Sequence, residues 1–128
     1  MKIESIDHVV LTVKDVEKTC EFYSKVMGME VVAFGEGRKA LTFGTQKINL
    51  QKLGRESTLI ADKPTSGSGD VCFVTSTSIK DVVAHLNACG VKLIGGPVER
   101  SGARGLMISV YFRDPDMNLI EVSHYAAP

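Results

Sequence analysis

The apolar residues of the first half alternate at a two-residue period and then recur at the spacing of a helix. "DHVVLTV" near the N-terminus predicts a strand. The helical positions after it are Val16, Cys20, Tyr23 and Met27. Gly28 then ends the helix, as a left-handed C-terminal cap. Three short strand candidates follow, at residues 30–34, 38–44 and 46–52.

The second half repeats this order of elements. "DVCFVT" predicts a strand, and a helical pattern follows it at Ile79, Val82, Leu86 and Cys89. Gly90 ends this helix, and strand candidates come at 91–94, 106–113 and 118–124. An offset of 62 residues aligns Gly28 with Gly90 and His8 with Asp70. "KINLQK" also aligns with "NLIEVS", which pairs Asn49 with Glu121.

The repeat predicts an α+β chain of two βαβββ modules that form a single domain. Module one spans about 1–53 and module two about 70–128. The join, residues 54–69, is rich in Gly, Ser, Thr and Pro, which is typical of a flexible linker. Its "SGSG" lacks the lysine and the following helix of a phosphate-binding loop.

Composition and charge narrow the classes of function. Fifteen basic and fifteen acidic residues cancel, and no basic run offers a nucleic-acid surface. The N-terminus has no signal-peptide pattern, and no apolar run approaches the roughly 20 residues that span a bilayer. Three cysteines without CxxC spacing indicate reduced thiols, expected as small core residues rather than nucleophiles. We therefore expect a cytoplasmic protein without nucleic-acid or membrane partners.

Glu121 raises a question about charge, because it lies in a strand among Leu119, Ile120 and Val122. A carboxylate that points into a closed interior must be paired or bound to a metal. The repeat makes His8 and Asn49 of the first half equivalent to Asp70 and Glu121 of the second. All four could ligate a divalent cation through nitrogen or oxygen.

Two longer motifs carry a resemblance to a known family. "IDHVVLTVKDVEKTCEFYSKVMGMEV" and "YFRDPDMNLIEV" resemble the vicinal oxygen chelate superfamily, whose members include glyoxalase I, extradiol dioxygenases, fosfomycin-resistance proteins and bleomycin-binding proteins. The resemblance covers nearly the whole chain. It implies that the two modules form a cupped, open barrel-like mixed sheet with the helices outside.

The resemblance also implies a ligand set for a metal ion. His8 and Glu121 match the family's first and last ligands, and Asp70 stands where a second histidine is usual. Asn49 stands where glyoxalase I has a glutamate. Gln51, two residues on and on the same strand face, is the alternative ligand at this position. This harder donor set favours Mn²⁺, Fe²⁺, Ni²⁺ or Mg²⁺ over Zn²⁺. The competing interpretation is a weak or lost metal site, with His8 structural and Asp70 capping a loop.

The implied activity is that of a metal-dependent, glyoxalase-like lyase or isomerase acting on a small oxygenated metabolite, as in lactoylglutathione-lyase chemistry. Glu121 would serve as the catalytic base. Asn49 cannot transfer a proton, so the second carboxylate of glyoxalase I is absent. Alternatives are a bleomycin-resistance type protein that sequesters a small molecule without reaction, and a metal-dependent dioxygenase. The expected substrate contacts are Tyr111, Gln51, Arg104 and Arg38.

Two further expectations follow. The open edges of the sheets predict a homodimer, and the resemblance implies that each site is shared between two chains. In "DPDMN", Met117 replaces the glycine usual in the family. Asn118 is therefore expected to adopt the left-handed turn conformation.

Overall fold

The computed structural model describes residues 1–126. Its contacts divide the chain into two compact units, residues 1–67 and 68–128, and each unit repeats the same order of elements. Within the described residues, neither helix is long and apolar enough to cross a membrane.

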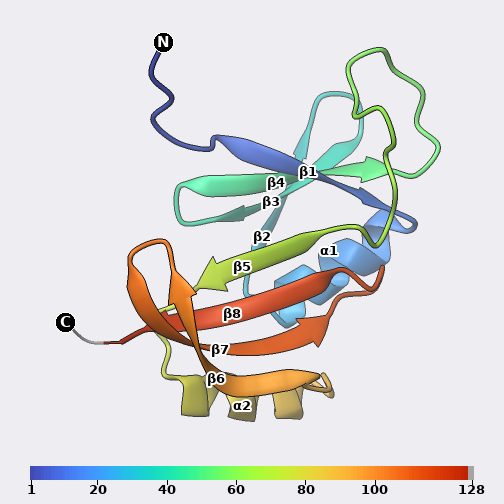
Figure 1. Cartoon of the computed structure of the whole chain (residues 1–128). Coiled ribbons are helices and arrows are strands. Elements are labelled where there is room, and N and C mark those ends of the chain that lie inside the picture. The colour runs from blue at the N-terminus through green and yellow to red at the C-terminus, as the bar shows by residue number, and fades with distance from the viewer. Residues whose placement is uncertain (127–128) are drawn as a thin grey trace. The chain divides into compact units, whose positions relative to one another are not determined.

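The first unit forms one mixed sheet with a helix (Figure 1). Its elements are β1 (His8–Val13), α1 (Val16–Lys25), β2 (Glu30–Phe34), β3 (Arg38–Phe43) and β4 (Gln46–Lys52). The strand order is β1-β4-β3-β2, with β1 parallel to β4 and the other neighbours antiparallel. A parallel pair needs a long crossover between its strands, and here α1, β2 and β3 supply it.

The core of the first unit lies between α1 and one face of this sheet. Asp15 begins the helix, because its carboxylate accepts a hydrogen bond from the backbone N–H of Lys18 at 3.1 Å. The helix then buries Cys20 and Tyr23. The sheet residues buried on its side alternate along their strands and are Leu11, Val13, Leu41, Ile48 and Leu50. Burying each large apolar side chain contributes about 1.5–3 kcal/mol.

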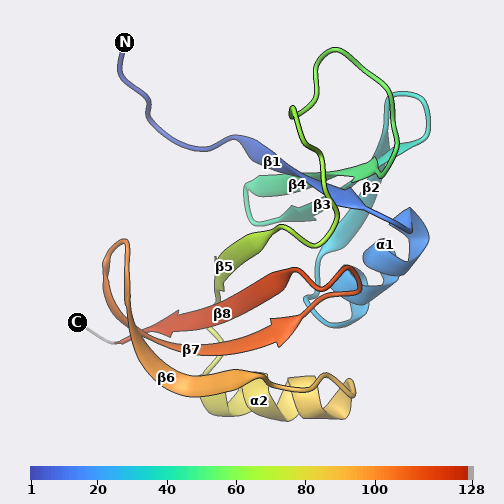
Figure 2. The ribbon, with the colours of Figure 1, turned by 45° about the vertical axis from the view of Figure 1, so that its right-hand side comes forward.

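The second unit has the same architecture (Figure 2). Its elements are β5 (Asp70–Val74), α2 (Ile79–Ala88), β6 (Gly95–Gly102), β7 (Gly105–Arg113) and β8 (Leu119–Tyr125). The strand order is β5-β8-β7-β6, and only β5 and β8 are parallel. Ser78 caps α2 by accepting from the N–H of Asp81 at 3.2 Å. The buried apolar residues of this unit include Val82, Leu86, Val110, Phe112, Ile120 and Val122.

The predicted duplication is confirmed, and the strand register shows how closely the halves agree. In the first sheet His8 pairs with Lys47 and Val10 pairs with Asn49. In the second sheet Asp70 pairs with Leu119 and Cys72 pairs with Glu121. His8 and Asn49 therefore stand in the same relation on β1 and β4 as Asp70 and Glu121 on β5 and β8. Both helices also end before a left-handed glycine, Gly28 at φ 68° and Gly90 at φ 73°.

One predicted strand of the second half is wrong. Residues 91–94 form no strand, and β6 occupies 95–102 instead. The segment "GGPVERSG" has a low strand propensity, but β7 offers it a long antiparallel partner, and that pairing outweighs propensity. The sequence "ERSGARG" accordingly forms the end of β6, a tight turn and the start of β7.

The expected left-handed residue of the "DPDMN" turn is also wrong. Met117, not Asn118, has a positive φ, of 71°. Asn118 is held by its partners: its backbone N–H and its Nδ2 donate to the two carboxylate oxygens of Asp114, at 3.0 and 2.9 Å. Its Oδ1 accepts from the N–H of Gly69 at 2.7 Å. These bonds fix Asn118 in the fold, so Met117 takes the strained conformation.

Candidate functional site

Glu121 lies on the face of the second sheet that carries Tyr111 and Cys72, its neighbours across β7 and β8 and across β5 and β8. Its side chain is half-buried. The Ser123 hydroxyl donates to Glu121 Oε2 at 3.3 Å, and the Ser123 oxygen lies 2.6 Å from that of Ser109. Ser109 and Ser123 are fully buried. This pair of hydroxyls therefore fixes one carboxylate oxygen of Glu121.

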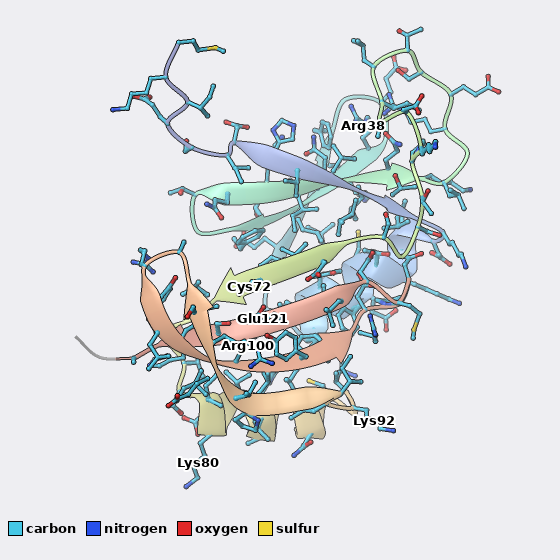
Figure 3. All side chains as sticks on the ribbon, in the orientation of Figure 1. Arg38, Cys72, Lys80, Lys92, Arg100 and Glu121 are labelled. Carbon is cyan, nitrogen blue, oxygen red and sulfur yellow. The ribbon has the colours of Figure 1, made fainter. Side chains whose placement is uncertain are left out.

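Cys72 lies beside Glu121 on the neighbouring strand, as Figure 3 shows. Its sulfur is 3.2 Å from the Ser123 oxygen. Partial burial raises the pKa of the Cys72 thiol above its ordinary value of 9.0, and the charges of Glu121 and Asp70 raise it further. The thiol therefore stays protonated near neutral pH.

The cysteine prediction is confirmed in part. Cys20 is a core residue as predicted, but Cys72 is exposed, contrary to the prediction. All three cysteines are free.

Tyr111 lies on the other side of Glu121, on β7. Arg100 Nε donates to its phenol oxygen at 3.1 Å. Burial raises the pKa of Tyr111 above 10.0; the bond from Arg100 lowers it, and a hydrogen bond with Glu121 raises it. The phenol is therefore neutral near pH 7. Because the Arg100 N–H occupies the phenol oxygen, the Tyr111 proton is free to point toward the carboxylate.

Asp70 is on the same face as Glu121. Since Cys72 pairs with Glu121, Asp70 lies diagonally across from that carboxylate, one pair further along the two parallel strands. The Asp70 side chain is exposed. The second unit therefore presents two carboxylates on one face with a protonated thiol beside both.

In the first unit, His8 begins β1 and is held by its neighbour in sequence. Its Nδ1 lies 2.7 Å from Asp7 Oδ1, and the side chains are 39% and 92% exposed, respectively. The hydrogen bond to His8 lowers the pKa of Asp7, so its carboxylate is charged and can only accept. A proton therefore lies on Nδ1, and in the neutral imidazole this leaves the Nε2 lone pair available. Metal-ligating histidines commonly have this arrangement.

Asn49 and Gln51 lie on β4, on the same face as His8. Asn49 is 6% exposed, and its Oδ1 has no hydrogen-bond partner among the residues described. An unpaired buried oxygen is costly unless a ligand satisfies it. Gln51 is equally buried, and its Nε2 donates to Thr12 Oγ1 at 3.5 Å, a long bond. Asn49 Oδ1 is therefore available to bind a ligand, whereas the amide nitrogen of Gln51 already forms a weak hydrogen bond with Thr12.

The two arginines predicted to contact substrate lie in different places. Arg104 is at the tip of the β6–β7 hairpin, where its guanidinium carbon lies 4.5 Å from the centre of the Tyr125 ring. Its backbone N–H donates to the Tyr125 hydroxyl at 3.1 Å. Arg38 is on β3 of the first unit, 4.7 Å from the centre of the Phe34 ring. No bond connects Arg104 to Tyr111 or Glu121 in the described part of the chain.

The chemistry of the predicted ligands fits a divalent cation, although no three acidic, histidine or cysteine side chains of residues 1–126 form a ready metal cluster. His8 offers a free Nε2, and Asn49 offers an orphaned oxygen. The hydrogen bond from Ser123 occupies only Oε2 of Glu121, and Asp70 is exposed. Two carboxylates balance a divalent charge. His8 and Asn49 belong to the first unit, whereas Asp70 and Glu121 belong to the second.

Three residues of these surroundings were missed from the sequence: Asp7, Cys72 and Ser123. Strand alternation places Ser123 on the face of Glu121, two residues away, so that residue was within reach of sequence reasoning. The bond from Arg100 to Tyr111 was not within reach, because no strand was predicted at residues 95–102. Asp7 precedes His8 directly, and an acid beside a candidate ligand is a usable indication.

The fold and these donors define a class of protein. The model of the glyoxalase/bleomycin resistance protein/dioxygenase superfamily matches residues 5–122, and the chain belongs to this superfamily.

The chain is similar to proteins of bacteria and a fungus. Virulence protein STM3117 of Salmonella typhimurium is 52% identical over 98% of this chain and 87% of that protein; its crystal structure has a TM-score of 0.96. The integron cassette protein VCH_CASS1 of V. cholerae is 53% identical, with 98% of both chains covered and a TM-score of 0.96. The glyoxalase domain-containing protein RDO1 of Mycosarcoma maydis is 50% identical over 98% of this chain and 70% of that protein.

Proposed function

We propose that this protein is a cytoplasmic metal-dependent lyase or isomerase of the glyoxalase type that acts on a small oxygenated metabolite. The observation that carries the proposal is Glu121. Its carboxylate is half-buried and forms no ion pair among the described residues, and its Oε2 accepts a hydrogen bond from Ser123. A partly desolvated carboxylate without a cation is suited to take up a proton or bind a cation.

His8, Asn49, Asp70 and Glu121 would hold the metal. One imidazole, one amide oxygen and two carboxylates favour Mn²⁺, Fe²⁺, Ni²⁺ or Mg²⁺ over Zn²⁺. When bound, the ion supplies Lewis-acid stabilisation of negative charge on a substrate oxygen.

The chain's own residues divide the remaining tasks. Ser123 occupies Oε2 of Glu121, so Oε1 would move the proton between adjacent carbons of the substrate. Tyr111 is neutral and would donate a hydrogen bond to a substrate oxygen, with Arg100 holding its ring and hydroxyl in position. Gln51, Arg38 and Arg104 would contact other polar groups of the substrate. The Cys72 thiol, being protonated, would exclude water beside Glu121 rather than attack the substrate.

The decisive measurement is elemental analysis of protein purified without chelator and then offered Mn²⁺, Fe²⁺ and Ni²⁺ in turn. The parent should retain about one equivalent of one of these metals, and His8→Ala and Glu121→Ala should lose it. The matched controls are His85→Ala and Glu99→Ala, which replace an exposed histidine on α2 and an exposed glutamate on β6. Both controls should retain the metal.

Two other results would change the conclusion. If parent and variants are equally free of metal after every loading, the catalytic proposal fails, and metal-independent sequestration of a small molecule becomes the better function. If His8→Ala alone retains the metal, the ligand set is wrong.

We also propose a homodimer whose sites are shared between chains. Strands β1 and β5 are edge strands of their sheets, and they expose Val9, Val10 and Val74 at 41%, 47% and 55%. Exposed apolar edge strands favour pairing with another chain. Sedimentation at micromolar concentration should give a dimer. Co-expressed His8→Ala and Glu121→Ala chains should recover about a quarter of the parental metal content, because half of the dimers carry one intact site of two. A monomer, or no recovery, would contradict shared sites.

A further inference from the structure

Two cations of the first unit share one aromatic ring. Arg38 Cζ lies 4.7 Å from the centre of the Phe34 ring, and Lys47 Nζ lies 4.9 Å from the same centre. Phe34 ends β2, Arg38 begins β3, and Lys47 is on β4. All three side chains are partly buried. The ring face attracts each cation, so Phe34 restrains two side chains that would otherwise be mobile.

Neither cation has an acidic partner in residues 1–126. No carboxylate of the described residues lies within 4.0 Å of Arg38 or Lys47. The charge of Lys47 is the smallest of the influences on the pKa of Asp7. Glu36, in the turn before Arg38, is exposed and forms no ion pair with it. Two partly desolvated like charges without a counterion repel each other, and an anion bound to them relieves that repulsion.

The strand register shows what lies on the same face. Lys47 and Asn49 are two residues apart on β4, Arg38 and Ala40 are two apart on β3, and Ala40 pairs with Asn49. All four side chains therefore lie on one face of the first sheet. Ala40 is small, so no bulky side chain separates Asn49 from the strand that carries Arg38. Asn49 is more than nine-tenths buried, and its Oδ1 lacks a partner.

We propose that this face binds an oxyanion group of a small molecule, a carboxylate or a phosphate, at Arg38 and Lys47. The guanidinium donates paired N–H bonds to such a group, and the ammonium adds a point charge. Asn49 Oδ1 is an acceptor, so it meets a donor of the same molecule or the proposed metal, not the anion itself. Phe34 is a positioning residue, because it holds both cations without touching the anion. The inference deepens the proposed function and rests on it, because Arg38 is a proposed substrate contact and Asn49 a proposed metal ligand. Binding of the anion is tested without metal, so the two proposals can fail separately.

The test is an NMR titration of the ¹⁵N-labelled full chain with inorganic phosphate and, separately, with malonate, at constant ionic strength against chloride. Saturable shifts should appear at the amides of residues 38–40 and 47–49. The tighter anion identifies the source, phosphate or carboxylate. Arg38→Gln and Lys47→Gln should each weaken binding by about tenfold or more.

The matched control is Lys39→Gln. Lys39 pairs with Leu50 and influences the pKa of Cys20 in α1, so it lies on the opposite face of β3. This variant should bind as the parent does. Phe34→Leu keeps both charges and should weaken binding by a few-fold, because the cations lose their restraint. Glu121→Gln should lose the proposed metal without weakening anion binding, because it removes a negative charge and no anion contact, and this separates the inference from the proposed enzyme.

Three results would overturn the proposal. One is the absence of saturable shifts with both anions. Another is an equal loss of affinity in Lys39→Gln, which would indicate general charge attraction. The third is unchanged affinity in both Arg38→Gln and Lys47→Gln.

Discussion

The two units share a backbone plan but differ in the chemistry of the sheet faces that carry the candidate residues. The first face carries an imidazole, two carboxamides and two cations that share an aromatic ring. The second carries two carboxylates, a thiol, two serine hydroxyls and a phenol. Asp70 and Glu121 stand at the register positions that His8 and Asn49 hold in the first unit. One duplicated scaffold therefore carries a basic and amide-rich face in one unit and an acidic face in the other.

This difference in charge indicates where a cation site and an anion site would be expected. The acidic face would attract a cation and move a proton, whereas the cationic face would attract an anionic group. The turns differ in the same way. The β3–β4 hairpin of the first unit turns through Gly44 at φ 54°, but the β7–β8 connection of the second depends on Asp114. The variants below alter one side of this comparison at a time.

The largest expected effect is on the acidic turn. Asp114 is 3% exposed and accepts from the backbone of Asp116 and from the backbone and side chain of Asn118. Asp114→Asn replaces an acceptor with an NH₂ group that faces the Asn118 amide. We expect a loss of roughly 2–3 kcal/mol in the free energy of unfolding, measured by urea denaturation. The exposed Asp62→Asn is the control, and equal stability of the two variants would contradict the role of the turn.

A second change tests the histidine of the first unit. Asp7→Asn removes the charged acceptor that keeps the proton of His8 on Nδ1. If the proposed metal site is correct, affinity for Mn²⁺ should fall about 10–100-fold, as for other lost partners of ligating histidines. Isothermal titration of the dimer measures this change. Unchanged affinity would show that His8 does not ligate through Nε2.

A third change should stabilise the second unit. Met117 has a φ of 71° and is 62% exposed, so Met117→Gly relieves backbone strain and loses few contacts. Removing the strain of the left-handed conformation stabilises the fold by about 1–2 kcal/mol, and the greater unfolded-state entropy of glycine offsets part of this. The free energy of unfolding should therefore rise by about 0.5–1 kcal/mol. In the first unit, Gly44→Ala should destabilise by a similar amount. Thermal unfolding measures the stability of both variants. A loss of stability in Met117→Gly would contradict the claim that Met117 is strained.

The smallest expected effect concerns the Cys72 thiol. Because the pKa of Cys72 is raised above 9.0, most of the thiol is still protonated at pH 9.0, so the rate of labelling by iodoacetamide should still rise with pH beyond that point. Glu121→Gln removes a negative charge and should speed labelling at pH 8 on the order of a few-fold. Peptide mapping by mass spectrometry separates Cys72 from Cys20 and Cys89. Equal rates in parent and variant would show that Glu121 does not influence the thiol.

Most of the fold was predictable because caps and hydrophobic periodicity, which are local features of the sequence, mark each element. The helices begin at Asp15 and Ser78 and end before Gly28 and Gly90, and apolar side chains follow the expected periods between them. The strand β6 was not predictable, since its glycines and proline disfavour a strand and only pairing with β7 creates one. The equivalence of His8 and Asn49 with Asp70 and Glu121 was likewise readable from the aligned halves.

The local partners of the candidate site could not be derived from the sequence in the same way. Arg100 on β6 donates to Tyr111 on the neighbouring strand β7. Ser123 lies within hydrogen-bonding distance of Cys72 on β5, Ser109 on β7 and Glu121 on β8. Such contacts depend on which strands are neighbours and in which register. Periodicity reports only the face on which a side chain lies.

The amino-acid sequence by itself determined the duplicated order of elements, the superfamily and the positions of the ligand candidates, because periodicity, caps and motifs are local properties of the chain. The tertiary structure alone decided that Met117 carries the strain of the turn, that Ser123 donates to Glu121, and that Arg38 and Lys47 share one ring. The physical reason is that hydrogen bonds and charge interactions act over a few ångströms between residues that strand pairing, not sequence proximity, brings together.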